Sequence, residues 1–231
     1  MVPSGDKKKA VVLLSGGLDS TTSLYVALKE GFKPYPLTIH YGQRHAKELE
    51  CARWIAQHLG LAMSEIAIRL PWQGSALLDP GISLPKGRSW EEMSREIPAT
   101  YVPARNTIFL SFALSWAEVL GASAIYIGAN ALDYSGYPDC RPEYFQQMEA
   151  VFKKATKWGV EGGEIHIVAP LLQKSKAEIV QWASELGVPL ASTWSCYEGG
   201  TAPCGECDSC LLREKGFREA GLVDPLMTPC Q

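Results

Sequence analysis

Two adjacent glycines and several hydroxyl side chains stand together near the N-terminus, in the stretch LLSGGLDSTT at residues 13–22. A short apolar run precedes this stretch and a segment with helical spacing follows it, so the residues predict a strand, a turn and a helix. Gly16 and Gly17 let the backbone approach a bound anion closely. Hydroxyl groups such as that of Ser15 add donors where a helix begins with unpaired N–H groups and the positive end of its dipole. The stretch therefore predicts a site for phosphate or pyrophosphate.

The spacing of these glycines excludes the two commonest phosphate-binding turns. A Walker loop needs a Lys after its last Gly, and a dinucleotide-binding turn needs G-x-G-x-x-G. Here Gly16 and Gly17 are adjacent and no Lys follows them. The alternative to a phosphate site is an ordinary strand-to-helix turn, capped by Asp19 or a neighbouring Ser.

Three further stretches each place an Arg beside aromatic and turn residues: YGQRH at 41–45, YVPARN at 101–106 and DYSGYPDCR at 133–141. Arg binds a carboxylate or phosphate through two donors at once. Tyr offers a flat face for stacking, and Asp can accept from the N–H groups of a purine-like ring. Taken singly, each Arg could equally be a solvated side chain at the protein surface. Together, the three stretches predict a site for a flat, anionic ligand.

Single residues outside these stretches have two interpretations each. Lys176 begins a predicted helix and could reach a phosphate. Glu178 is a helix cap, because Ser175 and Glu178 have capping-box spacing. Cys140 is either a reactive thiol or, as we favour, a packed one.

Four of the seven cysteines fall close together near the C-terminus, at Cys196, Cys204, Cys207 and Cys210. In a reducing cytosol such a group indicates metal rather than disulfides. Four thiolates complete a tetrahedral Zn²⁺ site, and a site with no open position is structural. Iron–sulfur binding also uses Cys-x₂-Cys-x₂-Cys and is the alternative.

The elements that must position these groups alternate between strands and helices. Parallel sheets in such chains are covered on both faces, and their ligands bind beyond the carboxyl ends of the strands. The loops at 15–22, 41–45 and 130–141 are therefore expected to share one site. The expected strands are 10–14, 35–41, 62–70, 124–129 and 165–169, and the expected helices are 46–59, 106–120, 142–158 and one from 175 to Gly187. Residues 106–120 are apolar on nearly every side and predict a buried helix, while 71–101 is predicted to be irregular, as a lid or a disordered segment.

Composition limits the class of protein. The 231 residues, 46% of them hydrophobic, suffice for one α/β domain at 1–190 with a small zinc-binding segment at 191–231 packed on it. A net charge of −3 gives no electrostatic reason to expect binding to nucleic acid or to a membrane. No apolar stretch reaches the roughly 18 residues of a membrane span, and the N-terminus lacks a signal-peptide core, so we expect a cytoplasmic protein.

The string SGGLDST resembles the SGGxDS signature of the PP-loop ATP pyrophosphatases, which cleave ATP between the α and β phosphates and transfer AMP to a substrate oxygen. Taken together, SGGLDSTT, YGQRH, VPARN, SGYPDCR and the four-cysteine tail resemble the 7-cyano-7-deazaguanine synthase family of the queuosine pathway, over residues 11–212. Two places depart from the commonest family form. Ala104 stands where Gly is frequent, and Ala131-Leu132 stand where Glu-Thr is frequent, which puts in doubt a role for an acid there.

The resemblance implies a doubly wound, five-stranded parallel sheet of the adenine-nucleotide alpha-hydrolase type. It also implies a ligase that uses ATP and Mg²⁺, carries structural Zn²⁺, and joins ammonia to 7-carboxy-7-deazaguanine through adenylated acid and amide intermediates. The implied ATP-binding residues are Leu14, Ser15, Gly16, Gly17, Leu18, Asp19, Ser20, Thr21, Thr22, Ser23 and Leu24. The implied substrate-binding residues are Tyr41, Gln43, Arg44, Arg105, Asn106, Asp133, Tyr137, Asp139 and Arg141. The implied catalytic residues are Ser15, Asp19, Ser20, Arg105 and Lys176, with Asp19 positioning Mg²⁺ or the loop.

Two other functions remain open at this point. A tRNA thiolase of the same superfamily would need a persulfide cysteine and an RNA-binding surface. A non-catalytic nucleotide-binding or zinc-dependent adaptor would bind ATP without forming AMP. The resemblance also implies a homodimer, and the sequence contains no fused glutaminase domain, so free ammonia or a partner must supply the nitrogen.

Overall fold

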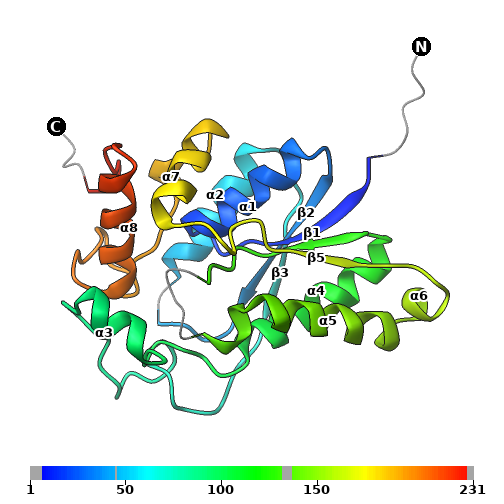
Figure 1. Ribbon diagram of the computed structural model, residues 1–231, viewed down its shortest axis with the longest axis horizontal. Helices are drawn as coiled ribbons and strands as arrows, with labels where there is room; N and C mark the ends of the chain where they lie inside the picture. The colour runs from blue at the N-terminus through cyan, green and yellow to red at the C-terminus, as the bar shows by residue number, and fades with distance from the viewer. Residues whose placement is uncertain (1–6, 45, 132–136, 228–231) are drawn as a thin grey trace.

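The computed structural model describes residues 7–44, 46–131 and 137–227, and its centre is one parallel sheet (Figure 1). The strand order is β3-β2-β1-β4-β5, and every neighbouring pair is parallel. This confirms the predicted five-stranded α/β architecture. The strands are β1 (Lys9–Leu13), β2 (Lys33–His40), β3 (Ser64–Ala67), β4 (Ala124–Tyr126) and β5 (His166–Val168).

Alternation along β1 explains why the sheet has a core on each face. Val11 and Leu13 belong to one cluster of buried side chains, while Ala10, Val12 and Leu14 belong to another. Successive residues of a strand point to opposite faces, so a strand buried on both faces is a continuous apolar run. The first cluster lies between the sheet and helices α4 and α5, and the second packs against α1 and α2 on the opposite face (Figure 1).

Short helices connect the strands and complete the C-terminal segment. Ser175 accepts from Glu178 N and Glu178 accepts from Ser175 N, so the predicted capping box is confirmed. Helix α8 packs beside α7 at one end of the molecule (Figure 1). The helices are α1 (Leu18–Lys29), α2 (Lys47–His58), α3 (Trp90–Arg95), α4 (Arg105–Leu120), α5 (Pro142–Ala155), α6 (Lys157–Val160), α7 (Lys176–Glu185) and α8 (Asp208–Glu219), with single 3₁₀ turns at Pro138–Cys140 and Leu190–Ser192.

Several sequence-based boundaries differ from the structure. The expected strand 62–70 is only four residues long in β3, and the expected helix 142–158 divides at Thr156, whose hydroxyl accepts from Gly159 N and caps α6. The segment 71–101 contains helix α3, begun by a capping box at Ser89. Helix α8 was not expected, because its low mean hydropathy gives a weak periodic signal.

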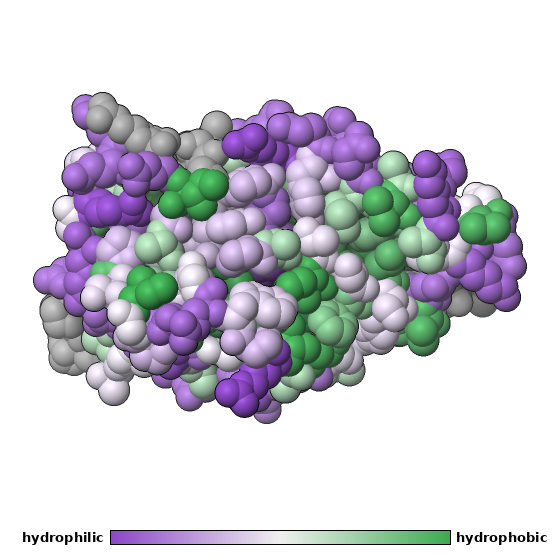
Figure 2. All heavy atoms as spheres, turned by 90° about the horizontal axis from the view of Figure 1, so that it is seen from below, coloured by the Kyte–Doolittle hydropathy of each residue, from purple (hydrophilic) through white to green (hydrophobic). Residues whose placement is uncertain are grey.

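The prediction of a helix buried on nearly every side at 106–120 is wrong. In α4 only Asn106, Leu110, Ala113 and Ala117 are buried, which is a single stripe at helical spacing, and Val119 is 81% exposed. Figure 2 shows hydrophobic side chains gathered over α4 and α5 on this face, within a largely hydrophilic surround. The apolar composition of α4 therefore covers the sheet on one side and forms protein surface on the other.

Among the described residues, no helix is both long and apolar enough to cross a membrane.

Candidate functional site

A cavity of about 260 Å³ opens beyond the carboxyl ends of β1, β2 and β4. The strand order reverses between β1 and β4, so this is the topological switch point at which ligands bind in such sheets. The loops after β1, β2 and β4 all reach it, as the sequence predicted, and the start of α4 reaches it too. The predicted site residues that line it are Leu14, Ser15, Gly17, Leu18, Asp19, Ser20, Tyr41, Gln43, Arg105, Asn106, Tyr137 and Lys176.

The glycine turn holds its shape because neighbouring backbone leaves no room for side chains. Gly16 has φ +89°, and a Cβ there would lie 2.1 Å from Glu48 O and 2.6 Å from Ala52 N on helix α2. From the other side, a Cβ on Gly128 would lie 2.7 Å from Ser20 N. The turn is therefore wedged between α2 and the chain that leaves β4, at the start of α1, where the first N–H groups of a helix have no partner within the helix.

The hydroxyl groups of this turn divide into two sets. Ser15 and Ser20 hydrogen-bond to each other at 3.0 Å and line the cavity. The Thr21 and Thr22 hydroxyls instead donate to Gly17 O and Leu18 O, at 2.7 and 2.8 Å. Thr21, Thr22, Ser23 and Leu24 are buried in α1 and do not line the cavity. Gly16 itself supports the turn from behind rather than lining the cavity.

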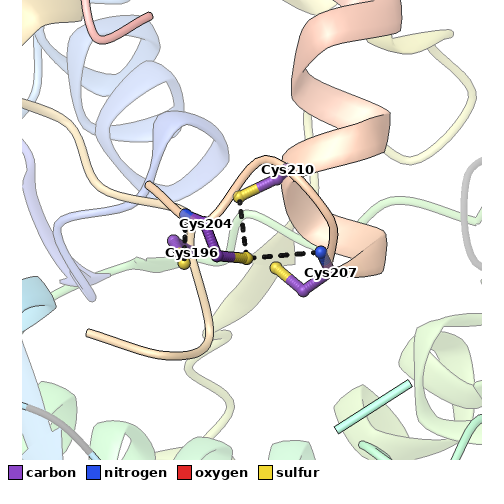
Figure 3. A group of neighbouring side chains, drawn as sticks. All are labelled: Cys196, Cys204, Cys207 and Cys210. Atoms are coloured by element: carbon purple, nitrogen blue, oxygen red, sulfur yellow. Dashed lines mark hydrogen bonds between the residues drawn. The ribbon is translucent and has the colours of Figure 1, made fainter. Parts of the chain in front are cut away.

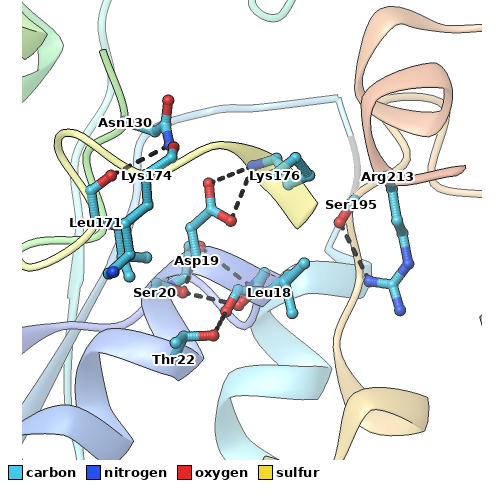
Figure 4. A network of polar contacts seen from close by, with 12 residues as sticks. Leu18, Asp19, Ser20, Thr22, Asn130, Leu171, Lys174, Lys176, Ser195 and Arg213 are labelled. Carbon is cyan, nitrogen blue, oxygen red and sulfur yellow. Dashed lines mark hydrogen bonds and ion pairs between the residues drawn. The ribbon is translucent and has the colours of Figure 1, made fainter. Parts of the chain in front are cut away.

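Lys176 and Asp19 face each other across the cavity floor, from the first turns of α7 and α1 (Figure 4). Lys176 Nζ donates to both carboxylate oxygens, at 2.8 and 3.0 Å. Gly216 on α8 lies directly behind this lysine, since a Cβ there would be 2.3 Å from Lys176 Cγ. A cation is thereby fixed beside the glycine turn, with a carboxylate beside it of the kind that can bind a metal.

Arg105 enters the cavity from the first residue of α4. Its guanidinium donates to the Tyr41 hydroxyl at 3.3 Å and lies 5.8 Å from the Tyr41 ring centroid and 5.9 Å from that of Phe109. The preceding residue, Ala104, has φ 53°, the only positive value recorded for a residue other than glycine in the described chain. A left-handed conformation explains why Gly is frequent there in the resembling family.

Several predicted site residues lie elsewhere. Arg44 donates to the carbonyls of Asp79 and Ile82, so it holds the 71–101 segment. Asp139 is buried and accepts from Asn106 N at 3.1 Å, so it caps α4. Arg141 is exposed at the start of α5 and does not line the cavity. Asp133 lies outside the described residues.

Glu48, in the first turn of α2, is a cavity-lining residue that the sequence reasoning missed. Burial raises the pKa of its carboxyl to about 7; the Arg105 charge opposes this shift and the Cys196 thiolate adds to it. Its position just after the YGQRH stretch was a usable signal. Other lining residues that were not expected are Asn130, Trp194, Ser195, Tyr197, Ser209 and Arg213.

Cys140 is buried and its Sγ accepts from the Asn106 amide at 3.3 Å. Burial raises the pKa of its thiol to about 12. The packed interpretation of this cysteine therefore holds, and a thiolate at neutral pH is disfavoured.

The four clustered cysteines turn their sulfur atoms toward one another (Figure 3). All four Sγ atoms lie within 4.8 Å of one another, and Cys204 Sγ is 3.9 Å from Cys210 Sγ. Four thiolates around tetrahedral Zn²⁺ have S···S separations of about 3.8 Å, from Zn–S bonds of about 2.3 Å, so the group fits. Thiol hydrogen bonds from Cys207 and then Cys210 hold the pKa of Cys196 well below its usual range, and backbone N–H groups of Cys204 and Glu198 add to this. Cys196 is thereby favoured as a thiolate, whereas the pKa values of Cys207 and Cys210 are raised because their thiols donate to it.

The cysteine segment contacts both the glycine turn and the 71–101 segment. Trp194 N donates to Gly16 O at 2.9 Å. Lys86 forms a β-bridge with Cys207, and Arg88 pairs with the fully buried Asp208. Arg213 on α8 is buried with Asp224 and reaches Ser195 at the cavity wall (Figure 4). An ion held by the four thiols would therefore stabilise one wall of the cavity.

Comparison with known proteins matches residues 9–221 to the family described as "Queuosine biosynthesis protein QueC". The chain is 57% identical over 222 residues to the 7-cyano-7-deazaguanine synthase of Trichodesmium erythraeum, covering 95% of this chain and 100% of that protein. It is 56% identical over 221 residues to the synthase of that name from Nostoc sp., covering 94% and 96%.

Among solved structures, the chain resembles the U34-tRNA thiolase NcsA of Methanococcus maripaludis, with 13% identity, a TM-score of 0.49, and coverage of 98% of this chain and 77% of that one. It also resembles a 4-thiouridine synthetase solved with RNA and ATP, with 22% identity, a TM-score of 0.46, and coverage of 93% and 50%.

Proposed function

The chain belongs to the queuosine biosynthesis protein QueC family, and on that premise we propose that it converts 7-carboxy-7-deazaguanine and ammonia into 7-cyano-7-deazaguanine at the expense of ATP. One observation carries the proposal at the level of the site. A single cavity joins the glycine turn to the Arg105 guanidinium, so that triphosphate and a carboxylate can be bound side by side.

The first half of the reaction makes an amide. A carboxylate resists attack by ammonia, because its oxygen is a poor leaving group. Attack of the carboxylate oxygen on the α-phosphorus of ATP forms an acyl adenylate and releases pyrophosphate. Ammonia then forms the C–N bond, and AMP leaves with the electron pair of the broken C–O bond.

The second half makes the nitrile at the same place. The amide oxygen attacks the α-phosphorus of a second ATP, which releases a second pyrophosphate, and the amide nitrogen loses a proton. Loss of AMP from this adenylated imidate, together with the second N–H proton, leaves the C≡N bond. One cavity suffices for both halves, since each presents a planar group on the same ring to the same glycine turn.

The proposed residue roles follow from placement in the cavity. The N–H groups around Ser15 and Ser20, with Lys176, bind the departing pyrophosphate and stabilise its developing charge. Arg105 binds the substrate carboxylate, and Tyr41 and Tyr137 provide ring faces for the deazaguanine. Asp19 holds Mg²⁺, which would neutralise charge on the triphosphate. The roles first expected for Arg44, Asp139 and Arg141 are not part of this proposal.

We also propose that the four thiols hold structural Zn²⁺ as part of a C-terminal segment at 191–231 on an α/β domain at 1–190. Purified protein should carry roughly one zinc ion per chain by elemental analysis, and Cys207→Ser should lower both metal content and melting temperature. Iron in place of zinc, with visible absorbance, would support the iron–sulfur alternative.

Two finer points about the protein in its cell remain proposals. The reduced cysteines fit a cytoplasmic protein. The hydrophobic surface of α4 and α5 fits a homodimer, as the family resemblance implies; sedimentation measurements test it.

The decisive assay incubates the protein with ATP, Mg²⁺, ammonium and 7-carboxy-7-deazaguanine, and follows nucleotides and bases by mass spectrometry. We expect AMP together with the amide and then the nitrile. Intact ATP, or AMP without change in the base, would refute the proposal. Arg105→Ala should lose most turnover while keeping the fold and the bound metal, and unchanged turnover would remove this residue from the mechanism.

The tRNA thiolase alternative has weaker support. It needs a reactive cysteine, and the raised pKa of the buried Cys140 thiol disfavours that role. Salt-sensitive binding of tRNA would revive it.

A further inference from the structure

Glu48 is a carboxylate in the cavity to which the proposed mechanism has given no role. It lies in the first turn of α2 and lines the same cavity as Arg105. Among the side chains that the structure describes, in residues 7–44, 46–93, 96–131 and 137–227, none donates a hydrogen bond to its carboxylate and no cation lies within ion-pair distance. Glu50, two residues further along the same helix, is exposed, and its carboxylate pairs with Lys47 at 3.1 Å.

The second acid lining the cavity is already engaged. Asp19 receives two hydrogen bonds from Lys176. Asp19 thus has a counter-charge and a proposed role toward Mg²⁺, whereas Glu48, the other acidic side chain along the described cavity wall, has neither. The Glu48 side chain is half-buried, so a bound cation or N–H donor would replace part of the water that its carboxylate has lost.

The titratable groups that interact with Glu48 come from four parts of the chain. Arg105 on α4 attracts it, while Tyr41 after β2, Cys51 on α2 itself and Cys196 in the C-terminal segment are the others recorded. A positive and a negative group thus stand near each other in one cavity. Such a pair suits two reactants of opposite charge that must meet.

The proposed reaction has two such reactants, a carboxylate and ammonium. We propose that Glu48 binds the ammonium ion beside the carboxyl group held by Arg105 and takes the proton that makes it a nucleophile. The inference rests on the proposed function. In this step one N–H bond of ammonium breaks and its proton passes to the Glu48 carboxylate. The freed electron pair forms the C–N bond, AMP leaves with the C–O electron pair, and the surplus proton on nitrogen passes to solvent.

The main competing role for Glu48 is to accept from the N–H groups of the deazaguanine ring. That role predicts a loss of affinity for the base and no change in the dependence on ammonium. A merely structural role, such as orienting Arg105, predicts a loss of adenylation. The three roles therefore separate by which half-reaction fails.

The test uses Glu48→Gln, which keeps size and an acceptor oxygen but removes the charge. Adenylation is measured by exchange of labelled pyrophosphate into ATP with the base and no ammonium, and amide formation is measured against ammonium chloride concentration. We expect the rate of pyrophosphate exchange to stay within about threefold of the wild type. The rate of amide formation at subsaturating ammonium should fall by at least about 100-fold, as is typical when a general base is removed. Glu50→Gln, a matched change on the same helix, should leave both rates unchanged.

Hydroxylamine supplies a second readout, because it is neutral at pH 7 and needs neither a counter-charge nor prior loss of a proton. With it, Glu48→Gln should form the hydroxamate within about threefold of the wild-type rate. Where Glu48→Gln fails to fold by circular dichroism, Glu48→Asp keeps the charge and is compared with Glu48→Ala in the same assays, with the higher ammonium-dependent rate expected for Asp.

Three results would overturn the inference: an unchanged ammonium dependence, a rise confined to the KM of the base, or loss of exchange in step with loss of amide. Failure of the proposed function is recognised separately. In that case the wild-type protein itself shows no exchange or AMP with 7-carboxy-7-deazaguanine.

Discussion

Replacing Gly16 with Ala tests whether the glycine turn is fixed by its neighbours rather than by its own hydrogen bonds. Gly16 has φ +89°, which an alanine adopts at a cost of about 1–3 kcal/mol. Its new Cβ would lie 2.1 Å from Glu48 O and 2.6 Å from Ala52 N, both backbone atoms of α2. No side-chain rotation relieves such a clash, so the turn or the helix must move.

The expected loss of stability can be worked from these contacts. Displacement of packed backbone destabilises the fold by about 1–3 kcal/mol more. The lower conformational entropy of the unfolded alanine chain offsets about 0.4–1 kcal/mol of this loss. A net loss near 3 kcal/mol is expected, and a protein of this size loses roughly 2–4 °C of melting temperature for each kcal/mol. Gly16→Ala should therefore melt roughly 6–12 °C below the wild type.

Gly17→Ala is the matched control. Gly17 has φ −77°, and its added Cβ would be 3.3 Å from Trp194 O and 3.4 Å from Ser15 Oγ, which is tight but tolerable. It should melt within about 3 °C of the wild type, a change below 1 kcal/mol. The assay is thermal unfolding followed by circular dichroism, with and without ATP. Equal melting temperatures for the two variants would refute the account of this turn.

Three other predictions concern buried groups. Asp224→Ala leaves the Arg213 guanidinium buried without its bidentate partner, so stability should fall by about 3–5 kcal/mol in urea unfolding. Glu214→Ala breaks an exposed pair with Arg218 and should change the free energy of unfolding by less than about 1 kcal/mol. Similar losses for the two variants would contradict a stabilising role for the buried Arg213–Asp224 pair. The thiol pKa of Cys140 is raised to about 12, so its thiolate is scarce at pH 8. Iodoacetamide should then label Cys140 in urea but not in the folded protein, as read by peptide mass spectrometry. Ala104→Gly should raise the melting temperature or leave it unchanged. The change removes about 1–2 kcal/mol of strain from the left-handed backbone at φ 53°, and the greater entropy of the unfolded chain offsets about 0.4–1 kcal/mol of that gain. A clear fall in melting temperature would contradict the strain assigned to this residue.

The parts of the fold that depend on local pattern could be predicted from the sequence. The apolar runs at β1 and β2 and the Ser175–Glu178 capping box appear where expected, because each depends on residues adjacent in the chain or one turn apart. The parallel sheet follows from the alternation of elements. Helix α8 was not predicted because its composition is largely polar, and the side chains that it buries can be identified only from its packing against α7.

The candidate site could be predicted as a set of loops, but not as a set of side chains. Arg105, Tyr41 and Lys176 line the cavity as the strand order requires. Arg44 and Arg141 have the same residue type and similar surroundings in the sequence, yet one holds the 71–101 segment and the other lies at the surface. Which arginine turns inward depends on the path of the neighbouring chain.

The sequence by itself determined the turn at Gly16 and Gly17 and the spacing of four thiols, because these are properties of a few consecutive residues. Tertiary structure alone decided that Glu48 joins the cavity and that Thr21 and Thr22 leave it. Helix α2 must dock against the glycine turn before Glu48 has a place in the site, and α1 must turn its hydroxyls back onto its own carbonyls. Long-range packing places Glu48 and buries Thr21 and Thr22, and it leaves no mark in the local pattern.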